Sequence, residues 1–227
     1  MIGIIGAMKI EVDSIKRMLK NTTSKTISGI EFLQGTLHEH EVVVAQCGIG
    51  KVFAGICAQT MILQYPVTEI INIGIGGTLC GELGLLDIAI SSAVVEHDMD
   101  TSPLGDPVGL ISGINIVEIP ACKRLADRFS KIATDMGKHS VCGIIASGDQ
   151  FISNPTKKSY IHQTFNAIAC EMEGAAIGQV CYVNHIDFVI IRTISDNADE
   201  TAGNMEYPIL CQEASKQSQR IIEAYLA

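Results

Sequence analysis

Two acidic motifs in the last third of the chain hold the residue types best suited to chemistry. Residues 169–176 read ACEMEGAA and include Glu173, and residues 192–199 read RTISDNAD and include Asp196. Each motif places a carboxylate where a predicted strand meets a helix or a loop, the rim at which α/β sheets bind ligands. Either residue alone is explained by a helix cap or a closed turn. Two carboxylates next to apolar strands, where unpaired burial is costly, indicate instead a site with acid–base chemistry.

Glycine-rich segments follow two predicted strands, GIG at residues 48–50 and GIGG at residues 74–77. Glycine lets backbone amides approach a ligand closely, and we expect both segments to be turns. Neither segment has the G-x-G-x-x-G spacing of a dinucleotide site or the Gly-Lys-Ser/Thr of a P-loop. A third loop, residues 146–152 (ASGDQFI), carries Phe151, which either belongs to the core or stacks on a base.

Strands alternate with helices along the chain, a pattern that predicts a layered α/β fold. The expected strands are residues 2–6, 26–37, 41–46, 69–73, 87–95, 140–146, 167–170 and 187–194. A first helix is expected directly after the first strand, with Val12, Ile15 and Leu19 on one face. Further helices are expected at residues 51–64, 120–136, 157–165, 173–184 and 206–226. A hairpin between 26–37 and 41–46 predicts a mixed sheet, and the absence of a linker predicts one domain over residues 1–227.

Composition excludes several classes of protein. Apolar residues make up 47% of the 227 residues, enough for a large core, and the net charge of −9 argues against nucleic-acid or membrane partners. Eight cysteines are scattered singly, which fits a reducing cytoplasm and no zinc site. The start reads as a strand, not a signal peptide, and no segment is long and apolar enough to span a membrane. His97 and Asp98 alone do not make a metal site, and we expect neither a metal nor a cofactor.

Seven motifs, taken in order, resemble the 5′-methylthioadenosine/S-adenosylhomocysteine nucleosidases of the purine nucleoside phosphorylase-like superfamily. They are GIIGAMKIEV, CGIGKV, INIGIGG, HDMD, ASGDQFI, CEMEGAA and RTISDNAD, and they span Gly3 to Asp199. The resemblance implies a three-layer α/β/α sandwich around a mixed central sheet and, commonly, a homodimer. It also implies hydrolysis of the N-ribosidic bond of 5′-methylthioadenosine, S-adenosylhomocysteine and related 5′-substituted adenosines.

The resemblance assigns roles to the acidic residues. Glu11 falls at the family's water-activating carboxylate, and Asp196 falls at the acid that protonates N7 of the purine. Glu173 would bind the ribose hydroxyls, and Met172 would pack on the sugar. These types suit the chemistry, because the sugar becomes cationic in the transition state and the base leaves more easily when protonated. The acid must hold its proton near neutral pH, which burial achieves by raising its pKa.

The resemblance also assigns binding roles. Phe151 would stack on adenine, and the main chain of Ile152 would read the Watson–Crick edge of the base. Gly77 would line the substrate site. Arg192 and Ser195 would support the water and the acid, respectively.

Three segments depart from the family pattern. The family's Thr-Gly-Ser-Ala-Gly-Gly is replaced by Ile-Gly-Ile-Gly-Gly-Thr at residues 73–78, and Glu96 replaces an aromatic residue. The segment from about Asp98 to Val108 also differs. It carries apolar residues in a loop, which often marks a contact surface, and we expect it in the interface of a homodimer.

Two other functions are compatible with these motifs. A purine nucleoside phosphorylase must hold a phosphate dianion, but four of the five arginines lie on predicted helices and only Arg192 belongs to a site motif. A nucleoside-binding or storage protein should lack part of the carboxylate set, which is complete here. We therefore expect a hydrolase. The preferred substrate among methylthioadenosine, adenosylhomocysteine, deoxyadenosine and 6-amino-6-deoxyfutalosine stays open.

Overall fold

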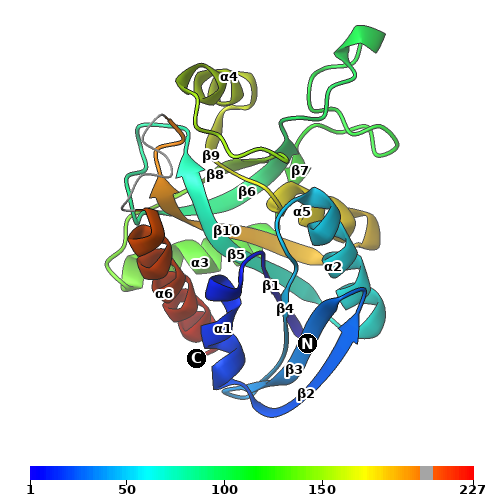
Figure 1. Cartoon of the computed structure of the whole chain (residues 1–227), viewed down its shortest axis with the longest axis vertical. Helices are drawn as coiled ribbons and strands as arrows, with labels where there is room; N and C mark the ends of the chain where they lie inside the picture. The colour runs from blue at the N-terminus through cyan, green and yellow to red at the C-terminus, as the bar shows by residue number, and fades with distance from the viewer. Residues whose placement is uncertain (200–206) are drawn as a thin grey trace.

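A mixed β-sheet forms the centre of the computed structural model, which describes residues 1–199 and 207–227 (Figure 1). Its ten strands in the described residues are β1 Ile2–Gly6, β2 Lys20–Ile27, β3 Ile30–Leu37, β4 His40–Gln46, β5 Glu69–Thr78, β6 Ile88–Glu96, β7 Ile119–Pro120, β8 Ser140–Ser147, β9 Ala167–Glu171 and β10 Asp187–Asp196. Strands β1, β4, β5 and β10 run parallel to their neighbours in this group. Their carboxyl ends therefore meet at one edge of the sheet, where α/β proteins bind ligands.

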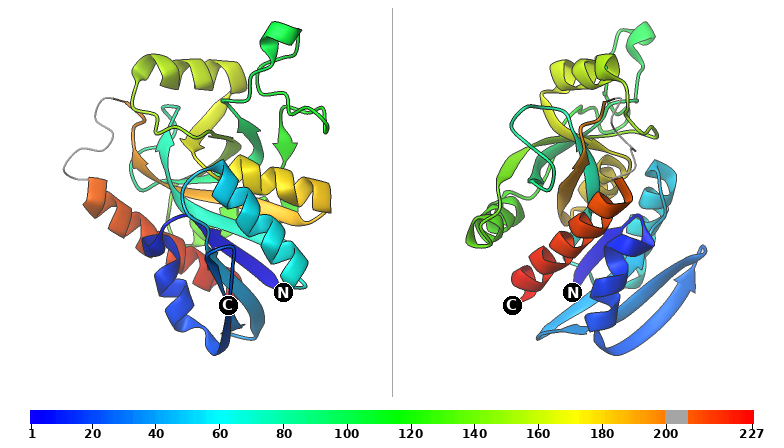
Figure 2. Two further views of the ribbon diagram at one scale, coloured as in Figure 1. Left: turned by 45° about the vertical axis from the view of Figure 1, so that its right-hand side comes forward. Right: turned by 60° about the vertical axis from the view of Figure 1, so that its left-hand side comes forward.

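Helices cover both faces of the sheet (Figure 2). They are α1 Lys9–Met18, α2 Lys51–Gln64, α3 Lys123–Asp135, α4 Pro155–Phe165, α5 Gly174–Asn184 and α6 Tyr207–Leu226, with a 3-10 turn η1 at Ser102–Leu104. Helices α2 and α5 pack together over one core cluster, and α1, α3 and α6 pack over a second cluster on the other face. The expected three-layer α/β/α architecture around a mixed sheet is thus confirmed.

Part of the sheet closes on itself. Strand β10 pairs with both β5 and β6, while β9 pairs with both β8 and β5. Since β6 also pairs with β8, these five strands form a ring. Closure brings the end of β9, with its acidic motif, next to the ends of β5 and β10. This ring brings the two acidic motifs together, although residues 172–186, which include α5, separate the end of β9 from the start of β10.

The segment from Gly74 to Gly77 is part of β5, and its prediction as a turn was wrong. It pairs with β10 from Gly74 opposite Arg192 to Gly77 opposite Asp196, with a shift of register between Ile194 and Asp196. A Cβ atom added at Gly74 would lie 2.7 Å from Glu11 Oε1, and one added at Gly77 would lie 2.7 Å from Asp196 Oδ1. Glycine is required here by the closeness of two carboxylates, not by the backbone angles of a turn.

Two further element predictions need correction. The strand predicted at residues 26–37 is two strands, β2 and β3, joined by a turn at Ser28 and Gly29, where φ is 52° and 77°. Strand β2 is polar and exposed at the sheet edge, so it lacks the apolar alternation that reveals a half-buried strand. The helix predicted from Pro120 begins at Lys123, because Pro120 still pairs with β6. Position 206, the predicted start of the last helix, lies outside the described residues.

None of the helices within residues 1–199 and 207–227 combines the length and the apolar character needed to cross a bilayer.

Candidate active site

A cavity opens at the carboxyl edge of the sheet, between the ends of β5, β9 and β10. Its empty space, counting the part that is open to solvent, is about 630 Å³. Its lining includes eight of the nine predicted site residues: Glu11, Gly77, Phe151, Ile152, Met172, Glu173, Ser195 and Asp196. The ninth, Arg192, lies behind the cavity wall.

Glu11 enters the cavity from the first turn of α1. Its Oε2 accepts a hydrogen bond of 2.8 Å from the amide of Met8, and its Oε1 accepts one of 3.2 Å from the amide of Ile75 in β5. The side chain is buried, and burial raises the pKa of Glu11, while these amides and the charge of Arg192 oppose the rise. A buried carboxylate of raised basicity is suited to accept a proton from water.

Asp196 is the last residue of β10. Its Oδ2 accepts a hydrogen bond of 2.9 Å from the Ser195 hydroxyl, and its Oδ1 accepts one of 2.8 Å from the amide of Ala198. Burial raises the pKa of Asp196, and these two hydrogen bonds partly oppose the rise. The contact with Ala198 closes a local turn, as the sequence suggested, but the same carboxyl group also lines the cavity. A carboxyl group that retains its proton can serve as a general acid.

The two carboxyl groups lie at different points along β5. Glu11 is beside Gly74 and Asp196 is beside Gly77, as the two glycines' close contacts establish. Three residues of strand correspond to roughly 10 Å. A small molecule held in the cavity can therefore meet an acid at one end and a base further along.

Glu173 precedes α5, but its side chain does not cap that helix. Its Oε1 instead accepts a hydrogen bond of 2.8 Å from the amide of Gly50, at the start of α2. Burial, together with the negative charge of Glu171, raises the pKa of Glu173 to about 7, and Arg192 opposes this rise. Glu173 can therefore exchange a proton near neutral pH.

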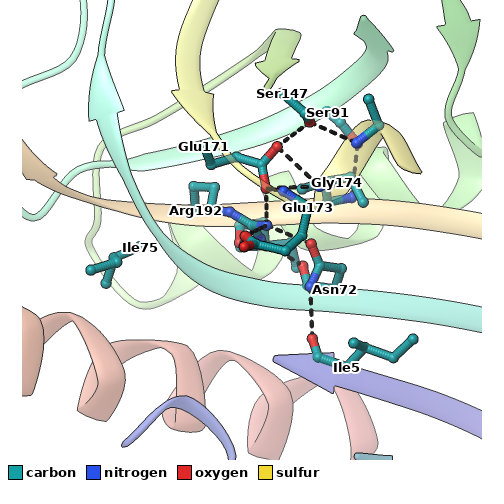
Figure 3. A network of polar contacts seen from close by, with 12 residues as sticks. Ile5, Asn72, Ile75, Ser91, Ser147, Glu171, Glu173, Gly174 and Arg192 are labelled. Atoms are coloured by element: carbon teal, nitrogen blue, oxygen red, sulfur yellow. Dashed lines mark hydrogen bonds and ion pairs between the residues drawn. The ribbon is translucent and has the colours of Figure 1, made fainter. Parts of the chain in front are cut away.

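Arg192 lies beneath the cavity and does not face solvent; only 1% of it is exposed. Its Nη2 forms an ion pair with Glu171 and donates a 2.5 Å hydrogen bond to Asn72 Oδ1, while Glu173 Oε2 lies 4.0 Å away (Figure 3). Its Nε has no hydrogen-bond partner among the residues that the structure describes. Arg192 is therefore committed to Glu171 and is poorly placed to hold a phosphate dianion.

The sequence reasoning missed three polar residues of this network, Glu171, Asn72 and Ser147. All three are buried; Asn72 interrupts the apolar run of β5, whereas Glu171 and Ser147 are the last residues of β9 and β8. The available signal was a polar residue inside or directly after an apolar run, because a buried polar side chain needs a partner. Glu171 stood one residue before Met172 in a motif already singled out, but it had been given no role.

Apolar side chains form the rest of the cavity. Phe151 is 51% exposed at its edge, Ile152 is buried, and Met172 lies between these extremes. Met8 and Ile49 also line the cavity. A flat or thioether-bearing ligand would find both an aromatic face and a largely apolar wall here.

Neighbouring charged residues are already paired. Lys51 Nζ binds Glu96 Oε2 at 2.9 Å and Asp98 Oδ1 at 2.7 Å. In the described part of the chain no three His, Cys, Asp or Glu side chains are grouped so that they could hold a metal ion. The departure at Glu96 from the family pattern thus supplies a partner for Lys51.

A family model of the phosphorylase superfamily matches residues 1–227, so the chain belongs to this superfamily. A 5′-methylthioadenosine/S-adenosylhomocysteine nucleosidase of Shewanella sp. (strain W3-18-1) is 42% identical over 200 residues, covering 87% of this chain and 86% of the relative. Within the superfamily, the chain therefore belongs to the 5′-methylthioadenosine/S-adenosylhomocysteine nucleosidases. It is an enzyme, a nucleosidase of the hydrolase class.

Solved structures agree with this placement. An MTAN mutant of Helicobacter pylori with 5′-methylthioadenosine in its active site superposes with a TM-score of 0.93 at 32% identity, covering 98% of this chain and 96% of that one. The native futalosine hydrolase of Helicobacter pylori strain 26695 superposes with a TM-score of 0.93 at 31% identity, covering 98% and 95% of the two chains.

Proposed function

We propose that the protein hydrolyses the N-ribosidic bond of 5′-methylthioadenosine, S-adenosylhomocysteine and related 5′-substituted adenosines, releasing adenine and the 5-substituted ribose. The observation that carries the proposal is the pair of buried carboxyl groups, Glu11 and Asp196, at separate points of one cavity. Hydrolysis needs an acid for the leaving base and a base for the attacking water, and these two residues supply them.

Asp196 donates its proton to N7 of adenine as the bond between N9 and the anomeric carbon breaks. The electron pair of that bond moves into the purine, and protonation neutralises the charge. Burial favours the protonated form of Asp196 before this step, because desolvation raises its pKa. Ser195, which donates to Asp196 Oδ2, holds the carboxyl group in place.

Glu11 accepts a proton from the attacking water as its oxygen bonds to the anomeric carbon. The amides of Met8 and Ile75 fix the carboxylate at the cavity wall. Arg192 lies behind the cavity wall and supports the water indirectly, because its charge acts on the carboxylate of Glu11. The ribose hydroxyls donate to Glu173, and Met172 packs on the sugar.

Adenine is recognised at the edge of the cavity. Phe151 offers a stacking face that any purine can use, so selection must come from directional hydrogen bonds. The main chain of Ile152 and the acid Asp196 supply these at the amino edge and at N7. A site built to pair polar groups rejects a base that leaves them unpaired.

Phosphorolysis and storage are less well supported. Arg192 is tied to Glu171, and Ile75 stands in the cavity where a hydroxyl would be needed to help hold phosphate. The complete set of Glu11, Glu173 and Asp196 argues against a protein that only stores nucleosides.

Turnover of four substrates side by side tests the proposal. We expect adenine release from methylthioadenosine, adenosylhomocysteine, 5′-deoxyadenosine and 6-amino-6-deoxyfutalosine to be measurable by chromatography, and methylthioadenosine to be among the preferred substrates because Met8, Ile49 and Met172 make much of the wall apolar. Methylthioinosine serves as the control for the base. Comparable turnover of the inosine analogue, or release of adenine from none of the four, would contradict the proposal.

We also propose that the protein is a homodimer. Apolar side chains are exposed on η1 and on the outer face of α2, where Leu104 is 83% and Val52 is 70% exposed. The segment around η1 projects from the body of the molecule at the top right of Figure 1. Exposed apolar surface of this kind marks a contact site, and we place both elements in the interface.

The dimer proposal predicts the effect of a charge at this face. Wild type should be dimeric by light scattering at micromolar concentration, and Val52→Glu should shift it towards monomer, because an ionised side chain opposes burial. Ile209→Glu is the matched control: Ile209 is 63% exposed on α6, across the sheet from α2. A wild-type monomer that is fully active would refute the dimer.

Two other properties are part of the proposal. Residues 1–227 form one domain, which is supported by strands from both ends of the chain sharing one sheet. The small-molecule substrate is met in the cytoplasm, which is supported by eight cysteines scattered singly through the sequence.

A further inference from the structure

Glu171 is the most extensively bonded side chain of the buried network in Figure 3. Its carboxylate accepts hydrogen bonds from the Ser147 hydroxyl, from the amide of Glu173 at 3.0 Å and from the amide of Gly174 at 2.8 Å. It also forms the ion pair with Arg192. Glu171 also lines the cavity, but these partners occupy all of its strong acceptor positions, so we do not expect it to bind substrate.

The contacts of Glu171 fix the position of Glu173. The amides of Glu173 and Gly174 begin α5, where backbone donors lack partners within the helix, and Glu171 caps them both. With its own amide held in this way, Glu173 does not cap the helix, and its side chain reaches across to Gly50. Glu171 and Glu173 thus both line the cavity, two residues apart in the chain, but only Glu171 caps the helix.

The contacts of Glu171 also determine how the charge of Arg192 is shared among the buried carboxyl groups. Three buried carboxyl groups, Glu11, Glu171 and Glu173, surround the single guanidinium of Arg192 in this network. Glu171 makes the direct ion pair, whereas Glu173 lies at 4.0 Å from the nearest guanidinium nitrogen. The ion pair with Glu171 therefore neutralises most of the charge of Arg192, so that little of it stabilises ionised Glu173. The network as a whole keeps an excess of negative charge.

We propose that Glu171 is a positioning residue that sets both the location and the protonation state of Glu173. This inference rests on the proposed function, in which Glu173 accepts hydrogen bonds from the ribose hydroxyls. The charged or titratable groups that face Glu173 are Glu171 on β9, Arg192 on β10, Glu11 on α1 and the Cys47 thiol after β4. Of these, Glu171 adds negative charge to Glu173 and at the same time occupies the cation.

The pH dependence of kcat/KM for methylthioadenosine tests the proposal. Ionised Glu173 is the binding form, so wild-type kcat/KM should fall as pH drops through the pKa of about 7. Glu171→Gln keeps an oxygen to cap α5 but removes the charge and frees Arg192 to pair with Glu173. Removing a like charge and gaining an opposite one both lower the pKa of an acid, so this limb should move to lower pH by about one unit. Glu173→Gln should lose the contribution of Glu173 to this limb and keep only the fall that protonation of the base Glu11 causes.

Glu69→Gln is the matched control. Glu69 is a buried carboxylate at the far end of β5, paired with the exposed Arg124 and with the Tyr225 hydroxyl, so its loss also removes the partners of a buried carboxylate. Its pH profile should superpose on that of wild type. A merely structural role of Glu171 would lower the melting temperature of Glu171→Gln without moving the limb.

The possible results distinguish a failure of the role of Glu171 from a failure of the proposed function. A Glu171→Gln profile that superposes on wild type, or that moves to higher pH, overturns the role of Glu171 while leaving the nucleosidase reaction intact. Absence of adenine release by wild type would instead overturn the proposed function. If Glu171→Gln does not fold, Glu171→Asp takes its place: its shorter side chain draws the carboxylate back from α5 and from Arg192. The limb should again move to lower pH, and a limb that stays at the wild-type position overturns the proposal.

Discussion

Asp196→Asn is expected to lower kcat for adenine release by about 10²–10⁴-fold, the usual contribution of a general acid. Asn keeps the shape of the side chain but has no acidic proton to give to N7. The alkaline limb of the wild-type pH profile, where Asp196 loses its proton, should disappear in the variant. Steady-state kinetics with methylthioadenosine between pH 5 and 9 provide the measurement.

Asp196→Asn should remain folded because the Asn side chain can keep the hydrogen bonds of Asp196. The Asn oxygen can still accept from the amide of Ala198, and its amino group can donate to Ser195, whose hydroxyl then turns to the Gly76 carbonyl at 3.4 Å. Burial raises the pKa of Asp196, so the folded state binds this proton more tightly than the unfolded chain does. The contribution of Asp196 to the free energy of unfolding therefore falls as pH rises from its pKa in the unfolded chain through its pKa in the folded protein. Asparagine does not titrate, so the variant does not lose this stability at high pH.

Asp187→Asn, at the exposed start of the same strand, is the control for the loss of a carboxylate from β10. It should retain wild-type kcat. The melting temperature of Asp196→Asn at pH 8 should be no lower than that of wild type. Retention of more than about a tenth of wild-type kcat by Asp196→Asn, well above the expected range, would rule out its assignment as the acid.

Glu11→Gln is expected to lower kcat by a similar factor of about 10²–10⁴, because Gln fills the same volume but cannot accept a proton from water. Glu11 accepts from two amides, those of Met8 and Ile75, and Gln offers one oxygen to them. The lost hydrogen bond costs about 1–3 kcal/mol, which removal of a buried charge offsets at least in part. The substitution should mainly lower kcat, and KM should change less.

Asp13→Asn is the matched variant for Glu11→Gln. Asp13 lies on the same helix, where it pairs with Lys9 outside the cavity, so its replacement removes a carboxylate from α1 without touching the site. We expect wild-type kinetics from it. If Glu11→Gln turned over methylthioadenosine at a rate close to that of Asp13→Asn, the water would have to be activated by another group.

The sequence was sufficient to predict the layered fold and eight of the residues that line the cavity. The apolar runs at β1 and at residues 188–191 of β10 indicated buried strands, and helix α2 was predicted at its observed bounds, Lys51–Gln64. Strand β2 escaped detection because an exposed edge strand buries no face and so has no apolar period. Closure of the sheet through Gly77 and Cys170 was equally hidden, since pairing partners distant in the chain leave no local pattern.

The roles of individual acidic residues were harder to predict. Glu173 was a reasonable candidate for a helix cap by position, yet the cap is Glu171, which reaches the same amides from the strand before. The glycines at 74 and 77 were interpreted as part of a turn because glycine is favoured both at a positive φ and where a carboxylate lies too close for a Cβ atom. Only the three-dimensional arrangement separates these alternatives.

The nucleophile is the most direct test of the account. Products of methylthioadenosine cleavage by wild type should be analysed by chromatography and mass spectrometry, in buffer without phosphate and in buffer with 50 mM phosphate, roughly the level at which a weak anion site would fill. We predict equal amounts of adenine and free 5-methylthioribose, formed at the same rate in both buffers. A requirement for phosphate, with a 5-methylthioribose-1-phosphate product, would contradict the assignment of water as the nucleophile and of Glu11 as its base.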